Sequence, residues 1–186
     1  MLEDQVRELV AESRIRQAMC RYARGVDRMD PDLIRSAFHD DGWDDHGPFR
    51  GNVEGLVDWV MRRHVHLPNA VHFLGNCSIE FAGPDVALVE SYYIALLRYS
   101  REAGESHRFL NGEMPNGEVD VTITGRYIDR FECRDGEWRI ARRKNAFDNM
   151  RIAKATADPG TTTENWAARD RSDPLYEMIR DVFEEE

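Results

Sequence analysis

Lysine and net positive charge are scarce in this chain of 186 residues. Only two of the 25 basic residues are lysines, Lys144 and Lys154, and 35 acidic residues bring the formal net charge to −10. Nucleic acids and anionic membranes are bound by concentrated positive charge. We therefore expect neither of them among the partners of this protein.

Paired cysteines and long apolar runs are also lacking. The three cysteines, Cys20, Cys77 and Cys133, are odd in number and far apart, so they predict neither a disulfide framework nor a zinc motif. They suit a reducing compartment. The first residues show no basic and apolar secretory signal, and the longest apolar run, 92–97, is too short to cross a bilayer. We expect a cytoplasmic protein.

Glycine-rich phosphate motifs are absent, as is a serine inside G-x-S-x-G. This excludes the familiar nucleotide-binding loops and argues against serine-hydrolase chemistry. The run Asp44-Asp45-His46, even taken with His64 and His66, offers only two-ligand spacings for a metal ion, which is a weak signal. The sequence therefore predicts no metal and no cofactor.

The elements that are present indicate one α+β domain. Apolar residues at steps of three and four predict an amphipathic helix over 2–28. Asp30-Pro31 and Asn52 predict the starts of two further helices, ending near Phe38 and His66. The later chain predicts strands over 71–82, 86–100, 119–133 and 138–148, a long loop over 101–118, a turn at 134–137 and a helix over 175–183. Helices should then cover one face of an antiparallel sheet.

Polar residues that interrupt apolar faces are the first candidates for chemistry. Asp27 follows Val26 at the end of the first helix, where a buried carboxylate would be costly unless paired. Strand alternation predicts that His72 and Asn76 face the same way. The alternative interpretations are a solvated carboxylate at a helix end and a structural histidine.

Two further groups stand out. Arg143, Asn145 and Phe147 share a face of the last predicted strand, and the run 43–46 combines an aromatic ring, two carboxylates and an imidazole. The alternative for Arg143 is a solvated position, because it lies within the basic run 142–144.

Three segments resemble the SnoaL-like proteins of the nuclear transport factor 2-like superfamily. They are RIRQAMCRYARGVDRMDPDLIRSAFHDDGWDDHGPFRG (14–51), AVHFLGNCSIEF (70–81) and GRYIDRFECRDGEWRIARRKNAFD (125–148), and the match covers about 5–150. The resemblance implies a cone-shaped half-barrel, in which a strongly curved, mainly antiparallel sheet wraps around a long N-terminal helix, with three to four helices. The domain would span 1–150, and an extension, 151–186, would pack on the same domain or on a neighbouring subunit.

The members most similar at the reactive positions are cofactor-independent lyases, namely scytalone dehydratase, bile acid 7α-dehydratase and hexachlorocyclohexane dehydrochlorinase. Their shared Asp–His dyad matches Asp27 and His72, and the arginine of the dehydrochlorinase matches Arg143. Tyr22, one turn before the aspartate, is a departure from the pattern and a further catalytic candidate. The pair Asp45-His46 is a second departure.

The resemblance implies a base-assisted elimination that removes water, halide or formaldehyde from a bulky aromatic or polycyclic substrate. Expected substrate-binding residues are Trp43, Asp45, His46, Phe73, Asn76, Tyr92, Asn145 and Phe147. The alternatives are a ketosteroid-type isomerase or polyketide cyclase, and a non-catalytic binding or assembly subunit. Sheets of this family leave a broad face without helices, so a homodimer or homotrimer is expected.

Overall fold

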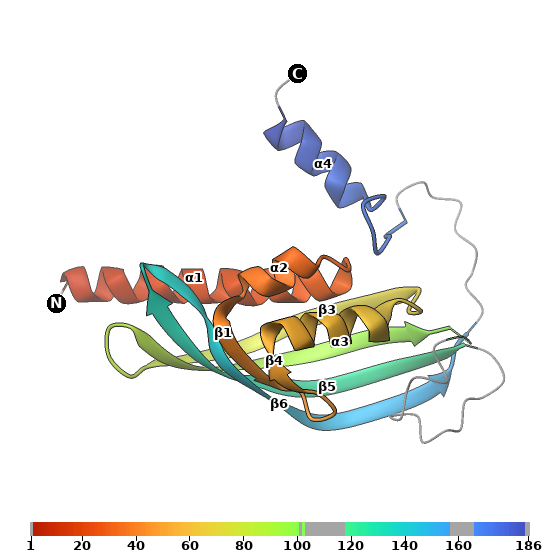
Figure 1. Ribbon diagram of the computed structural model, residues 1–186, viewed down its shortest axis with the longest axis horizontal. Helices are drawn as coiled ribbons and strands as arrows, with labels where there is room; N and C mark the ends of the chain where they lie inside the picture. The colour runs from red at the N-terminus through yellow and green to blue at the C-terminus, as the bar shows by residue number, and fades with distance from the viewer. Residues whose placement is uncertain (1, 101, 103–117, 157–165, 185–186) are drawn as a thin grey trace.

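The computed structural model describes residues 2–100, 102, 118–156 and 166–184 (Figure 1). Most of the loop expected at 101–118 lies outside the described residues. The elements are α1 (Leu2–Asp27), α2 (Pro31–Ser36), β1 (Phe38–Asp45), β2 (Arg50–Asn52), α3 (Val53–His64), β3 (Asn69–Phe81), β4 (Val86–Tyr99), β5 (Val119–Arg134), β6 (Glu137–Lys154) and α4 (Pro174–Phe183).

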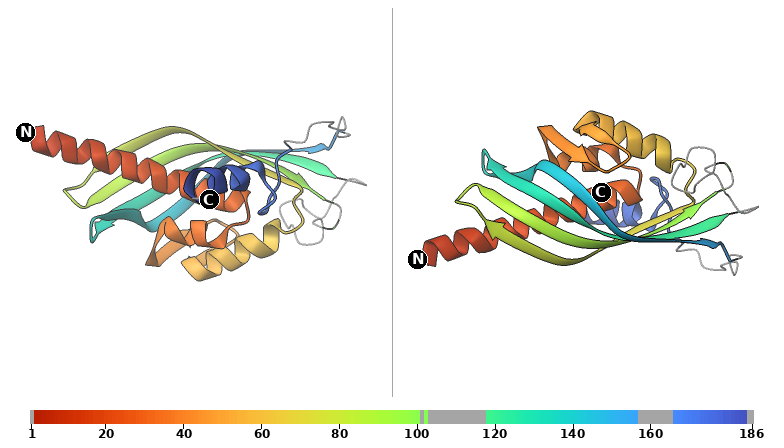
Figure 2. Two further views of the ribbon diagram at one scale, coloured as in Figure 1. Left: turned by 90° about the horizontal axis from the view of Figure 1, so that it is seen from above. Right: turned by 90° about the horizontal axis from the view of Figure 1, so that it is seen from below.

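The six strands form one curved sheet in the order β2-β1-β6-β5-β4-β3. β1 runs parallel to β6, and the other neighbouring pairs within the described chain are antiparallel. Helices α1, α2 and α3 lie on one face, whereas no described helix crosses the opposite face (Figure 2). This arrangement confirms the expected α+β cone.

Local signals explain where the helices begin. The side chains of Asp30, Asn52 and Asp173 each accept a hydrogen bond from a backbone N–H of the helix that follows. Proline occupies the first position of α2 and of α4, where its missing N–H removes no helical hydrogen bond. At the other end of the domain, Asp135 and Gly136 take positive φ in the turn that joins β5 to β6.

The core lies between α1 and the concave face of the sheet. Ile15, Met19, Tyr22 and Val26 on α1 pack against inward side chains of β4, β5 and β6. The first turns of α1 extend beyond the sheet, so Val6, Leu9 and Val10, which the helical pattern assigns to the packed face, are exposed. Among the described residues, no helix combines the length and apolar character that a membrane span requires.

Register shifts interrupt the simple alternation of the strands. β3 shifts against β4 between Leu74 and Cys77, and β5 shifts against β6 between Thr124 and Gly125 and between Arg130 and Phe131. β1 shifts against β6 between Phe38 and Trp43. A β-bulge of this kind adds a residue to one strand and reverses which side chains face inward beyond it. These shifts decide which of the candidate residues reach the site.

Candidate active site

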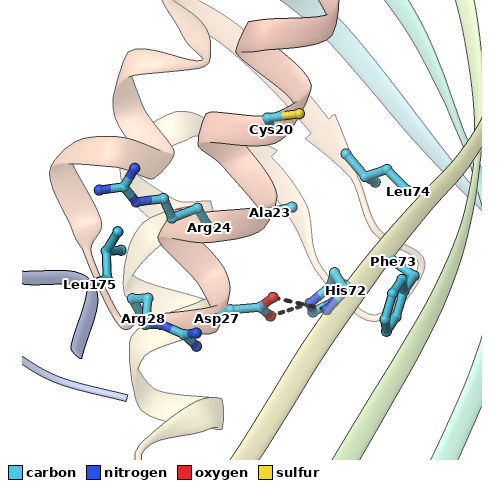
Figure 3. A pocket seen from close by; sticks show the side chains of 9 residues that line it. All are labelled: Cys20, Ala23, Arg24, Asp27, Arg28, His72, Phe73, Leu74 and Leu175. Atoms are coloured by element: carbon cyan, nitrogen blue, oxygen red, sulfur yellow. Dashed lines mark hydrogen bonds and ion pairs between the residues drawn. The ribbon is translucent and has the colours of Figure 1, made fainter. Parts of the chain in front are cut away.

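The end of α1 and the start of β3 bring Asp27 and His72 into contact (Figure 3). Asp27 Oδ1 lies 2.6 Å from His72 Nδ1, and Asp27 Oδ2 accepts the backbone N–H of His72 at 2.9 Å. Both side chains are largely buried. Because both carboxylate oxygens are engaged, the contact fixes the imidazole orientation and favours the tautomer with hydrogen on Nδ1. His72 Nε2 has no protein partner among the described residues.

This dyad borders a pocket of about 460 Å³ between α1, β3 and the start of α4. The volume lies within the range of small-molecule sites, roughly 300–1,000 Å³. The lining is apolar on one side and basic on the other. It consists of Cys20, Ala23, Arg24, Asp27, Arg28, His72, Phe73, Leu74 and Leu175 (Figure 3).

The C-terminal segment holds the end of α1 in place. Arg169 donates hydrogen bonds to the backbone oxygens of Val26 and Asp27 at 2.9 and 3.0 Å, and to those of His64 and Leu67 at 2.9 and 3.0 Å. A guanidinium at a helix C-terminus satisfies carbonyl groups that have no helical partner. Burial lowers the pKa of Arg169 to about 10, so the group remains charged at neutral pH.

Arg143 and Tyr22, both expected at the dyad, lie deeper in the cone and do not line this pocket. Arg143 is fully buried and donates from Nε and Nη2 to Asp129 at 2.8 and 2.7 Å. The guanidinium carbon lies 4.2 Å and 4.1 Å from the ring centres of Tyr22 and Tyr127. Asp129 raises the pKa of Arg143 above its usual value. The sequence offered no signal that Asp129 is the partner.

Residues 43–46 alternate between the two faces of the sheet. Asp44 and His46 face inward and are buried, with His46 Nδ1 3.1 Å from Asp44 Oδ1. Trp43 faces outward, and Asp45 Oδ1 accepts from Arg50 and from the backbone of Gly47. The expectation that Asp45 accompanies His46 in the site is therefore corrected to Asp44.

Asn76 and Tyr92 also face away from the dyad. The bulge in β3 turns Asn76 onto the outer face, so it does not point the same way as His72. Alternation along β4 places Tyr92 outside and Tyr93 inside. Phe73 is mostly exposed and lies at the rim shared by the dyad pocket and an outer-face pocket.

The inward residue of β4, Tyr93, connects the dyad with the interior. Its ring centre lies 6.4 Å from that of His72, and its hydroxyl donates to Asn145 Oδ1 at 3.0 Å. A Cβ on Gly125 would approach the Tyr93 hydroxyl to 2.7 Å, so glycine provides the space that this hydroxyl occupies. Tyr93 stacks on Tyr127 at 4.4 Å. Of the last two expected residues, Asn145 is buried, whereas Phe147 is partly exposed, with its ring 6.4 Å from that of His46.

No three His, Cys, Asp or Glu side chains within the described ranges are grouped as metal ligands. The chemistry that the site offers is proton transfer at imidazole and carboxylate groups, together with hydrogen bonding from buried tyrosines. Burial raises the pKa of Tyr93 to about 12 and raises the pKa values of Tyr22 and Tyr127 above their usual range, so all three stay protonated at neutral pH.

The Arg143–Asp129 pair generates a stability prediction. Arg143→Met should lower the free energy of unfolding by about 3–5 kcal/mol, because it leaves the buried Asp129 carboxylate without its partner. Arg143→Met combined with Asp129→Leu should recover most of this loss. Urea unfolding followed by circular dichroism measures both variants, and a double variant no more stable than the single one would contradict this explanation.

The buried tyrosines generate a pH prediction. Their pKa values are higher in the folded chain than in the unfolded chain, so above pH 10 unfolding releases protons and stability falls as pH rises, by about 1.4 kcal/mol per pH unit for each tyrosine. Tyr93→Phe should make this fall shallower, whereas Tyr92→Phe, which removes an exposed phenol, should not. The free energy of unfolding of both variants is measured from pH 9 to 11.5. Equal slopes of this free energy against pH in the two variants would contradict the prediction.

Comparison with known proteins places the fold. A hexachlorocyclohexane dehydrochlorinase of type 2 is 17% identical, with a TM-score of 0.70 over 84% of this chain and 99% of that one. A protein from Novosphingobium aromaticivorans assigned as a scytalone dehydratase is 21% identical, with a TM-score of 0.65 over 88% and 99%. Type 3 hexachlorocyclohexane dehydrochlorinase from Novosphingobium barchaimii is 18% identical, with a TM-score of 0.64 over 84% and 99%. At these identities the likeness concerns the fold.

No curated protein matches the sequence. The model of the SnoaL-like domain, however, matches residues 7–144, which is most of the chain. The expected family is thereby confirmed: this chain belongs to the SnoaL-like domain family, within the nuclear transport factor 2-like superfamily.

Proposed function

We propose that this protein is a cofactor-independent lyase that uses Asp27 and His72 for a base-assisted elimination. The observation that carries the proposal is the 2.6 Å contact between the two side chains at the border of a pocket large enough for an aromatic substrate. Structures with dehydrochlorinase and dehydratase names share the fold and support the same class of reaction.

In this mechanism His72 Nε2 removes a proton from a substrate carbon. The electron pair of the C–H bond forms the new double bond, and the leaving group departs with the electron pair of its own bond. Asp27 stabilises the imidazolium that forms, and a positioned base of this kind accelerates a reaction by roughly 10²–10⁴-fold. Arg24 and Arg28 also line the pocket, but the Arg24 guanidinium points away from His72 (Figure 3) and Arg28 Nε is paired with Asp173 at 3.2 Å, so neither is assigned to the leaving group.

The geometry favours this reaction over the two alternatives. An isomerase would use the carboxylate itself as the base, but both oxygens of Asp27 already accept hydrogen bonds from His72. A non-catalytic binding subunit gives no reason for a carboxylate and an imidazole to be paired beside a pocket. An apolar substrate with aromatic rings suits Phe73 and Leu74, which lie on the His72 side of the pocket (Figure 3).

The dyad is tested by His72→Ala and Asp27→Asn. Each should lower turnover about 10³-fold or more, because the base is removed or loses its orienting partner. Bulky aromatic alcohols and halides in ²H₂O form a suitable panel, with NMR following both product and deuterium exchange at carbon. His66→Ala removes an exposed imidazole outside the pocket and is the matched control. Near-wild-type rates in both dyad variants, with the fold intact by circular dichroism, would exclude the mechanism.

We also propose that the protein self-associates through the outer face of its sheet. In β4 the outward positions Leu88, Tyr92, Ile94 and Leu96 are at least as apolar as the inward ones, yet they are exposed. Exposed contiguous apolar surface is typical of an interaction site. The partner proposed for this face is a second copy of the chain, which would form the expected homodimer or homotrimer.

Sedimentation equilibrium tests this association. The wild-type protein should be a dimer or a trimer at micromolar concentration, and Ile94→Glu should shift it toward monomer because a charge would be buried between copies. Val65→Glu, at an exposed position after α3, should leave the mass unchanged. A monomeric wild-type protein would contradict the proposal.

A further inference from the structure

A separate pocket of about 420 Å³, which we call the arginine pocket, lies along the middle of α1. The end of α2 and the turn that joins β5 to β6 form its other walls. Its lining is mostly polar, and no lining residue is shared with the dyad pocket. The lining consists of Arg14, Gln17, Arg21, Ser36, Gly136, Glu137, Trp138 and Arg139.

Two arginines of α1 are held in this pocket by neutral acceptors. Arg14 and Arg21 are seven residues apart, which places them two turns apart on one side of the helix. Arg14 Nη1 donates to the backbone oxygen of Gly136 at 2.8 Å. Arg21 donates from Nε and Nη2 to Oγ and the backbone oxygen of Ser36 at 3.3 and 3.2 Å. These contacts orient both guanidinium groups but leave their charges without an ion pair among the described residues.

The third arginine of the pocket adds to this excess of positive charge. Arg139 forms a hydrogen bond with Glu137, which is the one carboxylate in the lining. Three guanidinium groups therefore surround one carboxylate, and two positive charges are unmatched. Burial lowers the pKa of Arg21, and the nearby Arg139 guanidinium lowers it further, while Glu137 acts in the opposite direction. A bound anion would relieve this repulsion.

Other arginines at the surface of the chain are paired with carboxylates. Arg98 binds Asp120 through hydrogen bonds of 2.7 and 2.9 Å, and Arg35 binds Glu54 at 2.8 and 2.9 Å. Carboxylates are readily available for such pairs, because the chain has 35 acidic and 25 basic residues. The excess positive charge of the arginine pocket is thus a local departure from the rest of the surface. It indicates that the missing partner is an anion from solution.

The number of unmatched charges selects the class of anion. Guanidinium groups bind carboxylates and phosphates through paired hydrogen bonds. A carboxylate supplies a single negative charge, whereas a phosphate ester carries roughly −1.5 to −2 at neutral pH and has three acceptor oxygens. The volume of the pocket lies within the range of small-molecule sites, so it has room for an organic group as well. Trp138, which is mostly buried, provides an apolar surface for that group.

We propose that Arg14, Arg21 and Arg139 form a binding site for an organic phosphate, separate from the dyad pocket. The phosphate oxygens accept hydrogen bonds from the guanidinium groups, and the organic part lies against Trp138. The site adds an anionic ligand to a protein whose proposed substrate is apolar. It does not depend on whether His72 acts as a base.

Phenyl phosphate and benzenesulfonate test the site, because both join a benzene ring to a tetrahedral oxyanion and they differ in charge. Each is titrated into ¹⁵N-labelled protein at constant ionic strength and pH 7.5. Phenyl phosphate should shift the Gly136 amide and Trp138 indole N–H signals saturably. It should bind about tenfold more tightly than benzenesulfonate, the effect of one further hydrogen bond between charged groups. Equal affinities, no saturable shift, or shifts confined to Phe73 and Leu74 of the dyad pocket would overturn the proposal.

Variants separate specific binding from general attraction by positive charge. Arg14→Gln and Arg21→Gln should each weaken phenyl phosphate binding about tenfold or more. Arg130→Gln is the matched control, because it changes the net charge equally but removes an exposed guanidinium outside the pocket, paired with Glu132 at 2.6 Å. Its effect should stay below about twofold, since salt screens distant surface charges. Equal weakening in Arg14→Gln and Arg130→Gln would contradict the site.

Two further measurements keep this test independent of folding and of the dyad. Arg14 is exposed, so Arg14→Gln remains informative should Arg21→Gln fail to fold, and circular dichroism monitors both. Asp27→Asn should bind phenyl phosphate with unchanged affinity, and a tenfold loss in that variant would place the ligand in the dyad pocket and contradict the proposal. Loss of turnover in the dyad variants has no bearing on this readout, so the two proposals fail independently.

Discussion

The contact between Asp27 and His72 connects the last turn of α1 to the edge strand of the sheet, and the proposed chemistry depends on it. A carboxylate with both oxygens bound to one residue, through its imidazole and its backbone N–H, cannot rotate without breaking a hydrogen bond. The imidazole is thereby fixed in direction and tautomer. Arg169 adds a restraint from the C-terminal segment, because it binds the carbonyl of Asp27 itself. The position of the proposed base therefore depends on α1, on β3 and on the C-terminal segment that carries Arg169.

The second constraint is the amount of charge inside the cone. Asp129, Arg143, Asp44 and His46 are all buried; Arg143 forms an ion pair with Asp129, and the His46 ring lies in hydrogen-bond contact with Asp44. Tyrosine rings fill the space between these pairs: Arg143 lies between Tyr22 and Tyr127, and Tyr93 stacks on Tyr127. Such an interior is rigid and polar in selected places, because each buried polar group requires a partner in a fixed position.

The sequence predicts most of the fold but only part of the site. Helix starts at Asp30 and Asn52 depend on local capping, and the dyad follows from the family resemblance, so both can be read from the chain. Bulges have no comparable sequence signal, and the one in β3 moved Asn76 to the outer face. Hydrophobicity does not distinguish the two faces of β4, since Leu88, Ile94 and Leu96 face outward, and for this reason the sequence pattern does not separate the outward Tyr92 from the inward Tyr93. Strand alternation counted back from His46 predicts that Asp44 shares its face. The pairing of Arg143 with Asp129, in contrast, follows only from the register between β5 and β6.

The most direct test of the central claim is the tautomer of His72, measured by ¹⁵N NMR at a pH where its imidazole is neutral. The proposed mechanism requires the hydrogen on Nδ1, bound to Asp27, and an unprotonated Nε2 that is free to accept a proton from carbon. An Nδ1–H signal coupled to His72 that disappears in Asp27→Asn, together with the chemical shift of an unprotonated Nε2, is the predicted result. A hydrogen on Nε2 and an unprotonated Nδ1 would contradict the account, because the base would then face the wrong way.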